Sequence, residues 1–209
     1  MKLECKEVNK STVVWSDNFF TQNELEEMYL EARYLNNLEL LSPTDTGGAT
    51  ITVKDNTTGE EKKEQLKKNK AIFLEKLYAT EPKLSSTLQI CNKRLQDDKF
   101  IDYMADIHPY FITLKNMKWS ILLSYYDNAD RYKGHRDSAF VTVLTWFYEE
   151  PKAFTGGDFI IENDFKIECK RGRTVFMPSY LLHEVTPIIM PEDKQEKGLG
   201  RYTLSHFIW

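Results

Sequence analysis

The sequence predicts an α+β domain that is mainly β, with helices in its first half and a barrel or jelly roll in its second. Two observations support this. Apolar residues recur at helical spacing before about residue 115, and short segments of strand character separated by Gly, Pro and Asn turns follow it. A chain of 209 residues is the size of one compact domain. We therefore expect a single domain, 1–209, in which 1–115 gives helical support and 116–209 forms the β core.

The first half contains two predicted helices. Residues 21–24, Thr-Gln-Asn-Glu, have the form of a capping box, and apolar residues follow at helical spacing, which predicts a helix near 22–36: Leu25, Met28, Tyr29 and Ala32. A second helix is expected between Ser86 and Ala105, with four apolar residues on one side: Leu88, Cys91, Leu95 and Ile101.

The segment 42–70 between these helices is polar, and only Ile51 and Val53 alternate like a short strand. We expect a hairpin or a mobile loop. A solvated surface excursion is the simpler interpretation, and a lid that closes over a site is the alternative. The following residues 71–74, Ala-Ile-Phe-Leu, are expected to form a buried strand.

Strand character dominates after Trp119, where β-branched and aromatic residues are frequent. The predicted strands are 121–126, 140–147, 157–161, 165–169, 173–177, 182–186 and 201–209. Short strands at this spacing are typical of a barrel or jelly roll.

Composition excludes several classes of protein. The formal charge of −4 and a pI near 5.7 disfavour nucleic-acid binding, and no apolar run approaches the roughly 20 residues that span a bilayer. The N-terminus lacks the apolar stretch of a signal peptide, so we expect a cytoplasmic protein without a membrane segment. Three cysteines without C-x-x-C spacing suggest reduced thiols rather than disulfides or a zinc ribbon. The oligomeric state is left open.

A candidate metal site begins with His135 and Asp137, which are two residues apart and so can point to the same side of an extended segment. Such a pair alone is a weak signal. His183 follows 46 residues after Asp137 on another predicted strand; alone it would be interpreted as a core histidine. Two imidazoles and one carboxylate leave coordination positions open, which suits non-haem Fe(II). Zinc is the rival metal, although the H-E-x-x-H motif of hydrolytic zinc helices is absent from the sequence.

A candidate anion site lies on the last strand. Strand alternation places four residues on one face: Arg201, Thr203, Ser205 and Phe207. An Arg beside small hydroxyls that points into an apolar barrel would bind a carboxylate bidentately. The alternative is an exposed Arg on an edge strand.

Several motifs occur in order around these residues. Tyr126 and Tyr132 precede His135 by nine and three residues, which gives a Y…Y-x-x-H-x-D pattern. Four further segments follow: 142–146 TVLTW, 155–159 TGGDF, 172–178 GRTVFMP before His183, and 185–187 VTP with 200–202 GRY after it. In these motifs, over about residues 118–209, the chain resembles the Fe(II)/2-oxoglutarate-dependent oxygenase superfamily, prolyl 4-hydroxylase-like branch.

The resemblance implies a double-stranded β-helix (jelly roll) with the N-terminal helices packed on one sheet. It implies Fe(II) on His135, Asp137 and His183, with Arg201 holding the distal carboxylate of 2-oxoglutarate. Cosubstrates would be 2-oxoglutarate and O₂, with ascorbate as an optional further cofactor. Four other residues match positions near the cosubstrate: Tyr126, Ser205, Thr203 and Trp146, the last where relatives often carry Tyr.

Two departures from the family pattern concern one residue type and one spacing. Ala129 stands where a Gly is usual between the paired tyrosines, and 18 residues separate His183 from Arg201. The additional residues between His183 and Arg201 are expected to form a solvent loop at Met190–Leu199. Insertions into surface loops cost little stability.

The resemblance implies hydroxylation of an unactivated C–H group, with a prolyl residue of a protein or peptide as the favoured substrate. Free amino acids, other small molecules and a catalytically silent jelly-roll binding module are the alternatives. Nucleobase demethylases of the superfamily carry a second Arg six residues after the first, and Phe207 occupies that position here.

Overall fold

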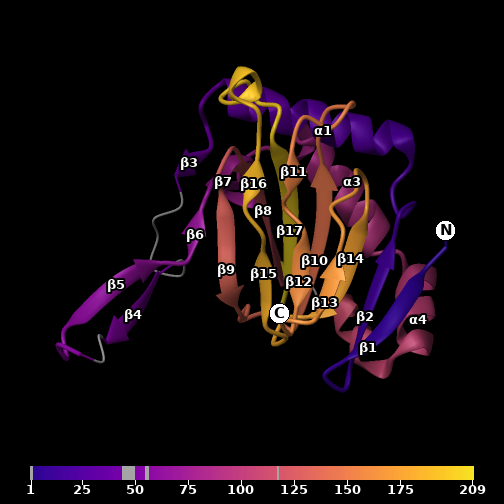
Figure 1. The fold of residues 1–209 in the computed structure, drawn as a ribbon. Helices are drawn as coiled ribbons and strands as arrows, with labels where there is room; N and C mark the ends of the chain where they lie inside the picture. The colour runs from indigo at the N-terminus through magenta and orange to yellow at the C-terminus, as the bar shows by residue number, and fades with distance from the viewer. Residues whose placement is uncertain (1, 44–49, 55–56, 117) are drawn as a thin grey trace.

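Two antiparallel sheets that face each other form the body of the protein in the computed structural model, which describes residues 2–43, 50–54, 57–116 and 118–209 (Figure 1). The major sheet has the order β1-β2-β14-β10-β17-β8-β7-β3, and the minor sheet has the order β13-β12-β15-β9-β6. Apolar side chains of both sheets, such as Trp146 and Val175 from one and Phe159 and Val185 from the other, form a shared core. The predicted mainly-β jelly roll is confirmed.

The strands of the major sheet come from both ends of the chain. Their bounds are β1 Glu4–Val8, β2 Ser11–Ser16, β3 Ser42–Pro43, β7 Lys70–Phe73, β8 Trp119–Tyr126, β10 Val141–Phe147, β14 Thr174–Pro178 and β17 Arg201–Ile208. The minor sheet contains β6 Lys67–Lys68, β9 Arg131–His135, β12 Phe159–Ile161, β13 Phe165–Ile167 and β15 His183–Val185. Two small pairs complete the fold, β4 Thr50–Lys54 with β5 Glu61–Gln65, and β11 Thr155–Gly156 with β16 Ile188–Ile189.

Helices cover the face of the major sheet that points away from the minor sheet. Side chains of α1 Gln22–Asn37 pack in one core with sheet residues such as Tyr202 and Leu204. The predicted capping box is present, since Thr21 accepts from the Glu24 amide and the Glu24 side chain accepts from the Thr21 amide. Glu24 also receives a forked hydrogen bond from Arg94, which ties α1 to the next long helix.

The second predicted helix is wrong in one respect, because it is two helices. α3 Ser86–Leu95 and α4 Asp98–Ile107 are separated at Gln96 and Asp97. The Asp97 carboxylate accepts from the Phe100 amide at 2.8 Å and so caps a new helix. Because the apolar residues of both helices continue one side, the sequence pattern did not reveal the break between them. Shorter helical segments are α2 Leu74–Leu77, η2 Pro82–Leu84, η3 Pro109–Lys115 and η4 Glu192–Lys194.

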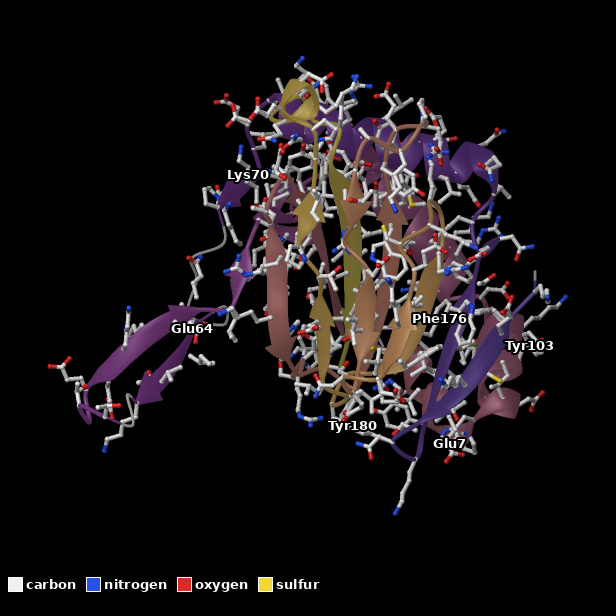
Figure 2. All side chains as sticks on the ribbon, viewed as in Figure 1. Glu7, Glu64, Lys70, Tyr103, Phe176 and Tyr180 are labelled. Carbon is white, nitrogen blue, oxygen red and sulfur yellow. The ribbon has the colours of Figure 1, made fainter. Side chains whose placement is uncertain are left out.

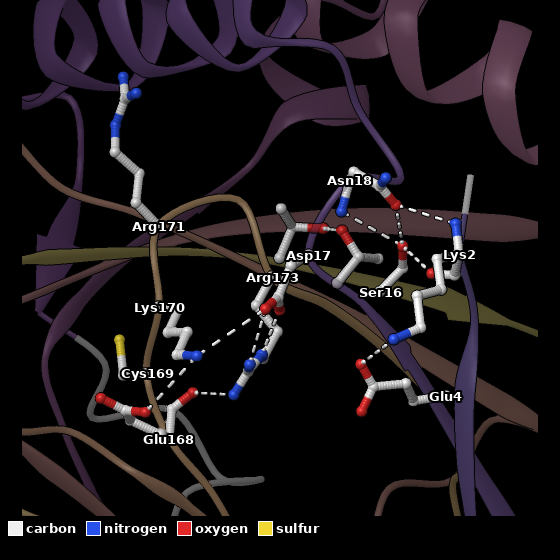
Figure 3. A network of polar contacts seen from close by, with 12 residues as sticks. Lys2, Glu4, Ser16, Asp17, Asn18, Glu168, Cys169, Lys170, Arg171 and Arg173 are labelled. Atoms are coloured by element: carbon white, nitrogen blue, oxygen red, sulfur yellow. Dashed lines mark hydrogen bonds and ion pairs between the residues drawn. The ribbon is translucent and has the colours of Figure 1, made fainter.

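The N-terminal hairpin β1–β2 was not predicted from the sequence. β2 pairs with β14 and so extends the major sheet at one edge. Asp17, just after β2, accepts two hydrogen bonds from Arg173, at 2.5 Å from Nε and 2.9 Å from Nη2 (Figure 3). Arg173 also donates to the Glu168 carbonyl. The helical first half is therefore preceded by strands that complete the β core.

The β4–β5 hairpin projects from the body beside β6, as Figure 1 shows, and the hairpin expected within 42–70 is confirmed. Ile51 and Val53 are both exposed. Glu64, at the base of the hairpin in Figure 2, pairs with Lys133 of β9. Parts of the expected lid, 44–49 and 55–56, lie outside the described residues, and the lid remains a prediction.

Two further expectations agree with the structure. Lys70–Phe73 forms strand β7, although Leu74 already begins α2. The expected solvent loop lies between β16 and β17, and its residues 191–194 are exposed. Among the described residues, no helix has both the length and the apolar character needed to cross a membrane.

Candidate metal and cosubstrate site

His135, Asp137 and His183 meet between the two sheets. One candidate ligand atom from each lies within 4.8 Å of the others. His135 ends β9 and His183 begins β15, and the two residues are direct partners in the antiparallel register. Asp137 follows two residues after His135, and its amide donates to the Ser179 carbonyl. The three predicted metal ligands are thus brought together, and their binding of a metal remains a prediction.

Backbone carbonyls fix the orientation of both imidazoles. His135 Nδ1 lies 2.9 Å from the Lys133 carbonyl, and His183 Nδ1 lies 2.8 Å from the Leu181 carbonyl. Because a carbonyl only accepts, each Nδ1 carries a proton, and in the neutral form of the ring the lone pair then lies on Nε2. The two Nε2 atoms face Asp137 at 3.6 and 3.4 Å. This tautomer leaves Nε2 of each ring available to a metal.

The protonation states also suit a metal. Burial lowers the pKa of His135 to about 3, so the ring is neutral at neutral pH. Burial opposes ionisation of Asp137, but the neighbouring imidazoles and a 2.8 Å hydrogen bond from Thr142 Oγ1 hold its pKa below the usual value. Neutral imidazoles and an ionised carboxylate are the ligand forms that bind divalent ions.

Arg201 is fully buried at the start of β17. Its Nη1 donates to the carbonyl of Gly157, and its guanidinium lies 4.4 Å from the centre of the Tyr126 ring. Gly157 has a φ of +68°, and a Cβ there would lie 2.4 Å from Ile188 Cδ1, so this turn requires glycine.

Two nitrogens of Arg201, Nε and Nη2, have no hydrogen-bond partner among the described residues, and no acidic side chain there pairs with it. These two atoms form one forked edge of the guanidinium, which matches the two oxygens of a carboxylate. A buried and unpaired guanidinium is costly unless an anion binds. The site therefore fits the distal carboxylate of 2-oxoglutarate.

A single cavity of about 420 Å³ joins this Arg to the three candidate metal ligands. All the residues that the sequence marked as candidates line it: Tyr126, His135, Asp137, Trp146, His183, Arg201, Thr203 and Ser205. Thr203 Oγ1 and Trp146 Nε1 are buried donors without a partner in the described chain. Burial raises the pKa of Tyr126 to about 12, against the opposing effect of Arg201, so its hydroxyl stays protonated. These atoms could complete hydrogen bonds to a bound carboxylate.

Sequence reasoning missed Lys67, a cation in the same cavity. Lys67 is 7% exposed and belongs to β6, where it pairs with Tyr132 of β9. Burial lowers the pKa of Lys67 to about 8, while the charge of Asp137 opposes this shift. No pattern separates Lys67 from its neighbours in the polar run 67–70, so only the fold reveals it.

Thr142 was noted only as part of a family motif, and the structure shows what it contacts. Its hydroxyl bridges Asp137 Oδ2 and Ser179 Oγ, both at 2.8 Å. The residues present, two imidazoles, one supported carboxylate and an unpaired buried guanidinium, fit Fe(II) together with 2-oxoglutarate.

Known proteins resemble the chain in part of its sequence and in its fold. No family model matches the chain. PKHD-type hydroxylases from two strains of Shewanella baltica are 27% identical to it over 100 residues, which cover 41% of this chain and 45% of the relative. The match thus spans less than half the length of these curated relatives.

Solved structures match over nearly the whole chain. A Pseudomonas putida prolyl-4-hydroxylase superposes with a TM-score of 0.59 at 15% identity, covering 94% of this chain and 91% of that one. The viral collagen prolyl hydroxylase of Paramecium bursaria Chlorella virus-1 gives 0.53 at 13% identity, covering 93% of each chain. A 2OG-Fe(II) oxygenase family protein from Burkholderia pseudomallei gives 0.51 at 14% identity, covering 93% and 84%. The chain thus shares its fold with prolyl hydroxylases and a 2OG-Fe(II) oxygenase family protein, and over 100 residues it is similar in sequence to PKHD-type hydroxylases.

Proposed function

We propose that this chain is an Fe(II)- and 2-oxoglutarate-dependent dioxygenase that hydroxylates an unactivated C–H group. The observation that supports this most strongly is the meeting of two unlike sites in one cavity. A cluster of two His and one Asp with open coordination positions lies beside a buried guanidinium whose forked edge is unpaired. A silent binding module would have no need of both.

In this proposal His135, Asp137 and His183 hold the ion through three ligand atoms that lie within 4.8 Å of one another, and coordination positions stay open for other ligands. Arg201 orients 2-oxoglutarate by its distal carboxylate, with Tyr126, Thr203, Ser205 and Trp146 around it. When bound, iron, O₂ and 2-oxoglutarate supply the oxidising power, so that the substrate gains a hydroxyl while 2-oxoglutarate becomes succinate and CO₂. Neither His135 nor His183 acts as an acid or a base.

The cavity walls would protect such a reaction from water. Leu144, Phe159 and Val185 line the cavity beside the metal ligands, and each belongs to the core between the sheets. An apolar wall excludes water that would otherwise intercept a reactive centre. The residues 1–209 would act as one domain, since helices, sheets and cavity share their cores.

We propose a prolyl residue of a protein or peptide as the first substrate class to test, in line with the prolyl hydroxylases among the structural neighbours. A free amino acid or another small molecule is the second class, because the fold alone says little about the oxidised carbon. Fe(II), 2-oxoglutarate and O₂ are the proposed cofactor set, and ascorbate should be included in assays.

The test measures succinate formed from 2-oxoglutarate by the purified chain with and without Fe(II). We expect iron-dependent turnover that His135→Ala, Asp137→Ala and His183→Ala each abolish without unfolding the domain. His108→Ala is the matched control, since His108 lies outside the cavity, at the N-cap of η3. Absence of iron-dependent turnover in the wild type, or full turnover in a triad variant, would contradict the proposal.

A further inference from the structure

Lys67 is a buried cation that lacks an anionic partner within the described chain. Its side chain lines the cavity at 7% exposure, and its Nζ lies 5.1 Å from the centre of the Tyr132 ring. Neither a hydrogen bond nor an ion pair to Nζ occurs among the described residues. Tyr132 in turn stacks on His135, with 3.4 Å between ring centres. The ammonium group is thus held near the metal ligands.

The strand that carries Lys67 is fastened on both sides of it. Leu66 accepts a 2.9 Å hydrogen bond at its carbonyl from the Lys133 amide, and Glu64 pairs with the Lys133 side chain. On the other side, Lys68 pairs with Asp130 at 3.4 Å. The neighbouring lysines therefore face outward to partners or solvent, while Lys67 alone faces inward. The strand pairing therefore sets the face of β6 to which Lys67 points.

The charges in the cavity show what Lys67 would contact. Among the described residues that line it, Asp137 is the acidic side chain, and Lys67 and Arg201 are the basic ones. A divalent ion and dianionic 2-oxoglutarate cancel each other, and Asp137 cancels one of the two cations. One positive charge remains. A buried charge is stable only when it is paired, so a further anion should enter with the remaining ligand, which is the primary substrate.

Resting on the proposed function, we infer that Lys67 is a specificity-determining residue that pairs with a carboxylate of the primary substrate. The substrate class is then a free amino acid, or the C-terminal residue of a peptide, whose carboxylate lies near the oxidised carbon. An internal prolyl residue has no such charge. The distal carboxylate of 2-oxoglutarate is excluded from this role because the unpaired fork of Arg201 fits it.

The experiment measures binding rather than turnover. The Mn(II)-substituted protein with 2-oxoglutarate is titrated with the free L-amino acids and with peptides ending in proline, each compared with its carboxamide. Trp146 and Trp209 line the cavity and give a fluorescence signal. We expect at least one acid to bind about 30-fold or more tightly than its amide, as is typical for a desolvated charge pair.

The variant Lys67→Met should remove this preference for the acid and leave the affinity for the amide and for 2-oxoglutarate within about twofold. Lys67→Gln is a second neutral variant. Lys70→Met is the matched control, because Lys70 lies three residues away and is exposed (Figure 2). Both neutral variants at position 67 should melt no lower than the wild type, since they remove an unpaired buried charge.

Three results would overturn the inference. Acids and amides could bind equally across the panel, or the preference for the acid could persist in Lys67→Met and Lys67→Gln. Alternatively, these variants could lose affinity for 2-oxoglutarate, which would assign Lys67 to the cosubstrate. None of these results would contradict the proposed function. That function is tested separately, by iron-dependent conversion of 2-oxoglutarate to succinate in the absence of the primary substrate.

Discussion

The hydroxyl of Thr142 donates a 2.8 Å hydrogen bond to Oδ2 of Asp137. Thr142 lies on β10 of the major sheet, whereas the histidines that flank Asp137 belong to strands of the minor sheet. The carboxylate is therefore held from one sheet while the imidazoles are held from the other. Loss of this support should be visible in metal affinity.

We predict that Thr142→Val weakens binding of Fe(II) or Mn(II) by roughly 10–100-fold, the usual effect of losing a group that orients a metal ligand. The measurement is a metal titration followed by calorimetry. Thr145→Val is the control, because Thr145 is buried on the same strand but bonds to Thr174 at 3.0 Å. Equal losses in the two variants would mean that the effect is general damage to β10.

Arg201→Ala should leave metal affinity unchanged and weaken 2-oxoglutarate strongly, since removing one partner of a buried charge pair costs on the order of 3–5 kcal/mol. Arg173→Ala offers the opposite pattern. Arg173 already pairs with Asp17, so its loss should lower the melting temperature and leave the affinity for 2-oxoglutarate unchanged. An Arg201 variant with an affinity within about twofold of wild type would remove Arg201 from the cosubstrate site.

The projecting hairpin can be shortened without disturbing Lys67. Residue 51 pairs with residue 64, so replacing residues 52–63 by Asn-Gly closes the same ladder with a two-residue turn. If the hairpin is a lid, affinity for metal and 2-oxoglutarate should stay within about twofold while turnover of the primary substrate falls about tenfold or more. Unchanged turnover would make the hairpin a surface excursion. A deletion that extends to residue 68 would also remove Lys67 from the cavity, so it could not distinguish a lid from a surface excursion.

Stability should fall below pH 6.5 partly because of His206. Burial lowers the pKa of this residue to about 3, whereas in the unfolded chain it is near its model value of 6.5. Between these values the unfolded chain binds the extra proton, so the free energy of unfolding decreases as the pH falls. This loss is about 1.4 kcal/mol per pH unit and amounts to a few kcal/mol between pH 6.5 and 4. His206→Leu should remove it.

Urea titrations of the wild type and the variant at a series of pH values measure this difference. Other groups contribute the same slope to both proteins, so the difference isolates position 206. Parallel curves would show that His206 becomes charged inside the folded protein.

The sequence predicted the parts of the fold that bury apolar residues at a regular spacing. Strands β8, β10 and β17 have strong β propensity, and α1 carries both a capping box and an apolar stripe. β1 could not be predicted in this way because four of its five residues are exposed, so its sequence ECKEV lacks the apolar alternation that marks a strand. The break between α3 and α4 was missed because both helices continue one apolar side.

The candidate site was predictable where residue type alone limits the chemistry, as for His135, Asp137, His183 and Arg201. Lys67 was not, since its role depends on a pairing with β9 that spans 65 residues of sequence. Ala129 is an intermediate case. It stands where the family usually has glycine, and its φ of +62° shows that the turn keeps the left-handed conformation that favours glycine.

The charge that Lys67 brings to the cavity depends on the pairing of the two-residue strand β6 with β9. Lys67 lies opposite Tyr132 and Lys68 lies opposite Arg131. Because successive side chains of a strand point to opposite faces, a slip of one position would turn Lys67 to solvent and present Leu66 or Lys68 to the cavity. If Lys67 recognises the substrate, insertion or deletion of a single residue between the hairpin and β7 should change which ligands the protein accepts while leaving the three candidate metal ligands in place.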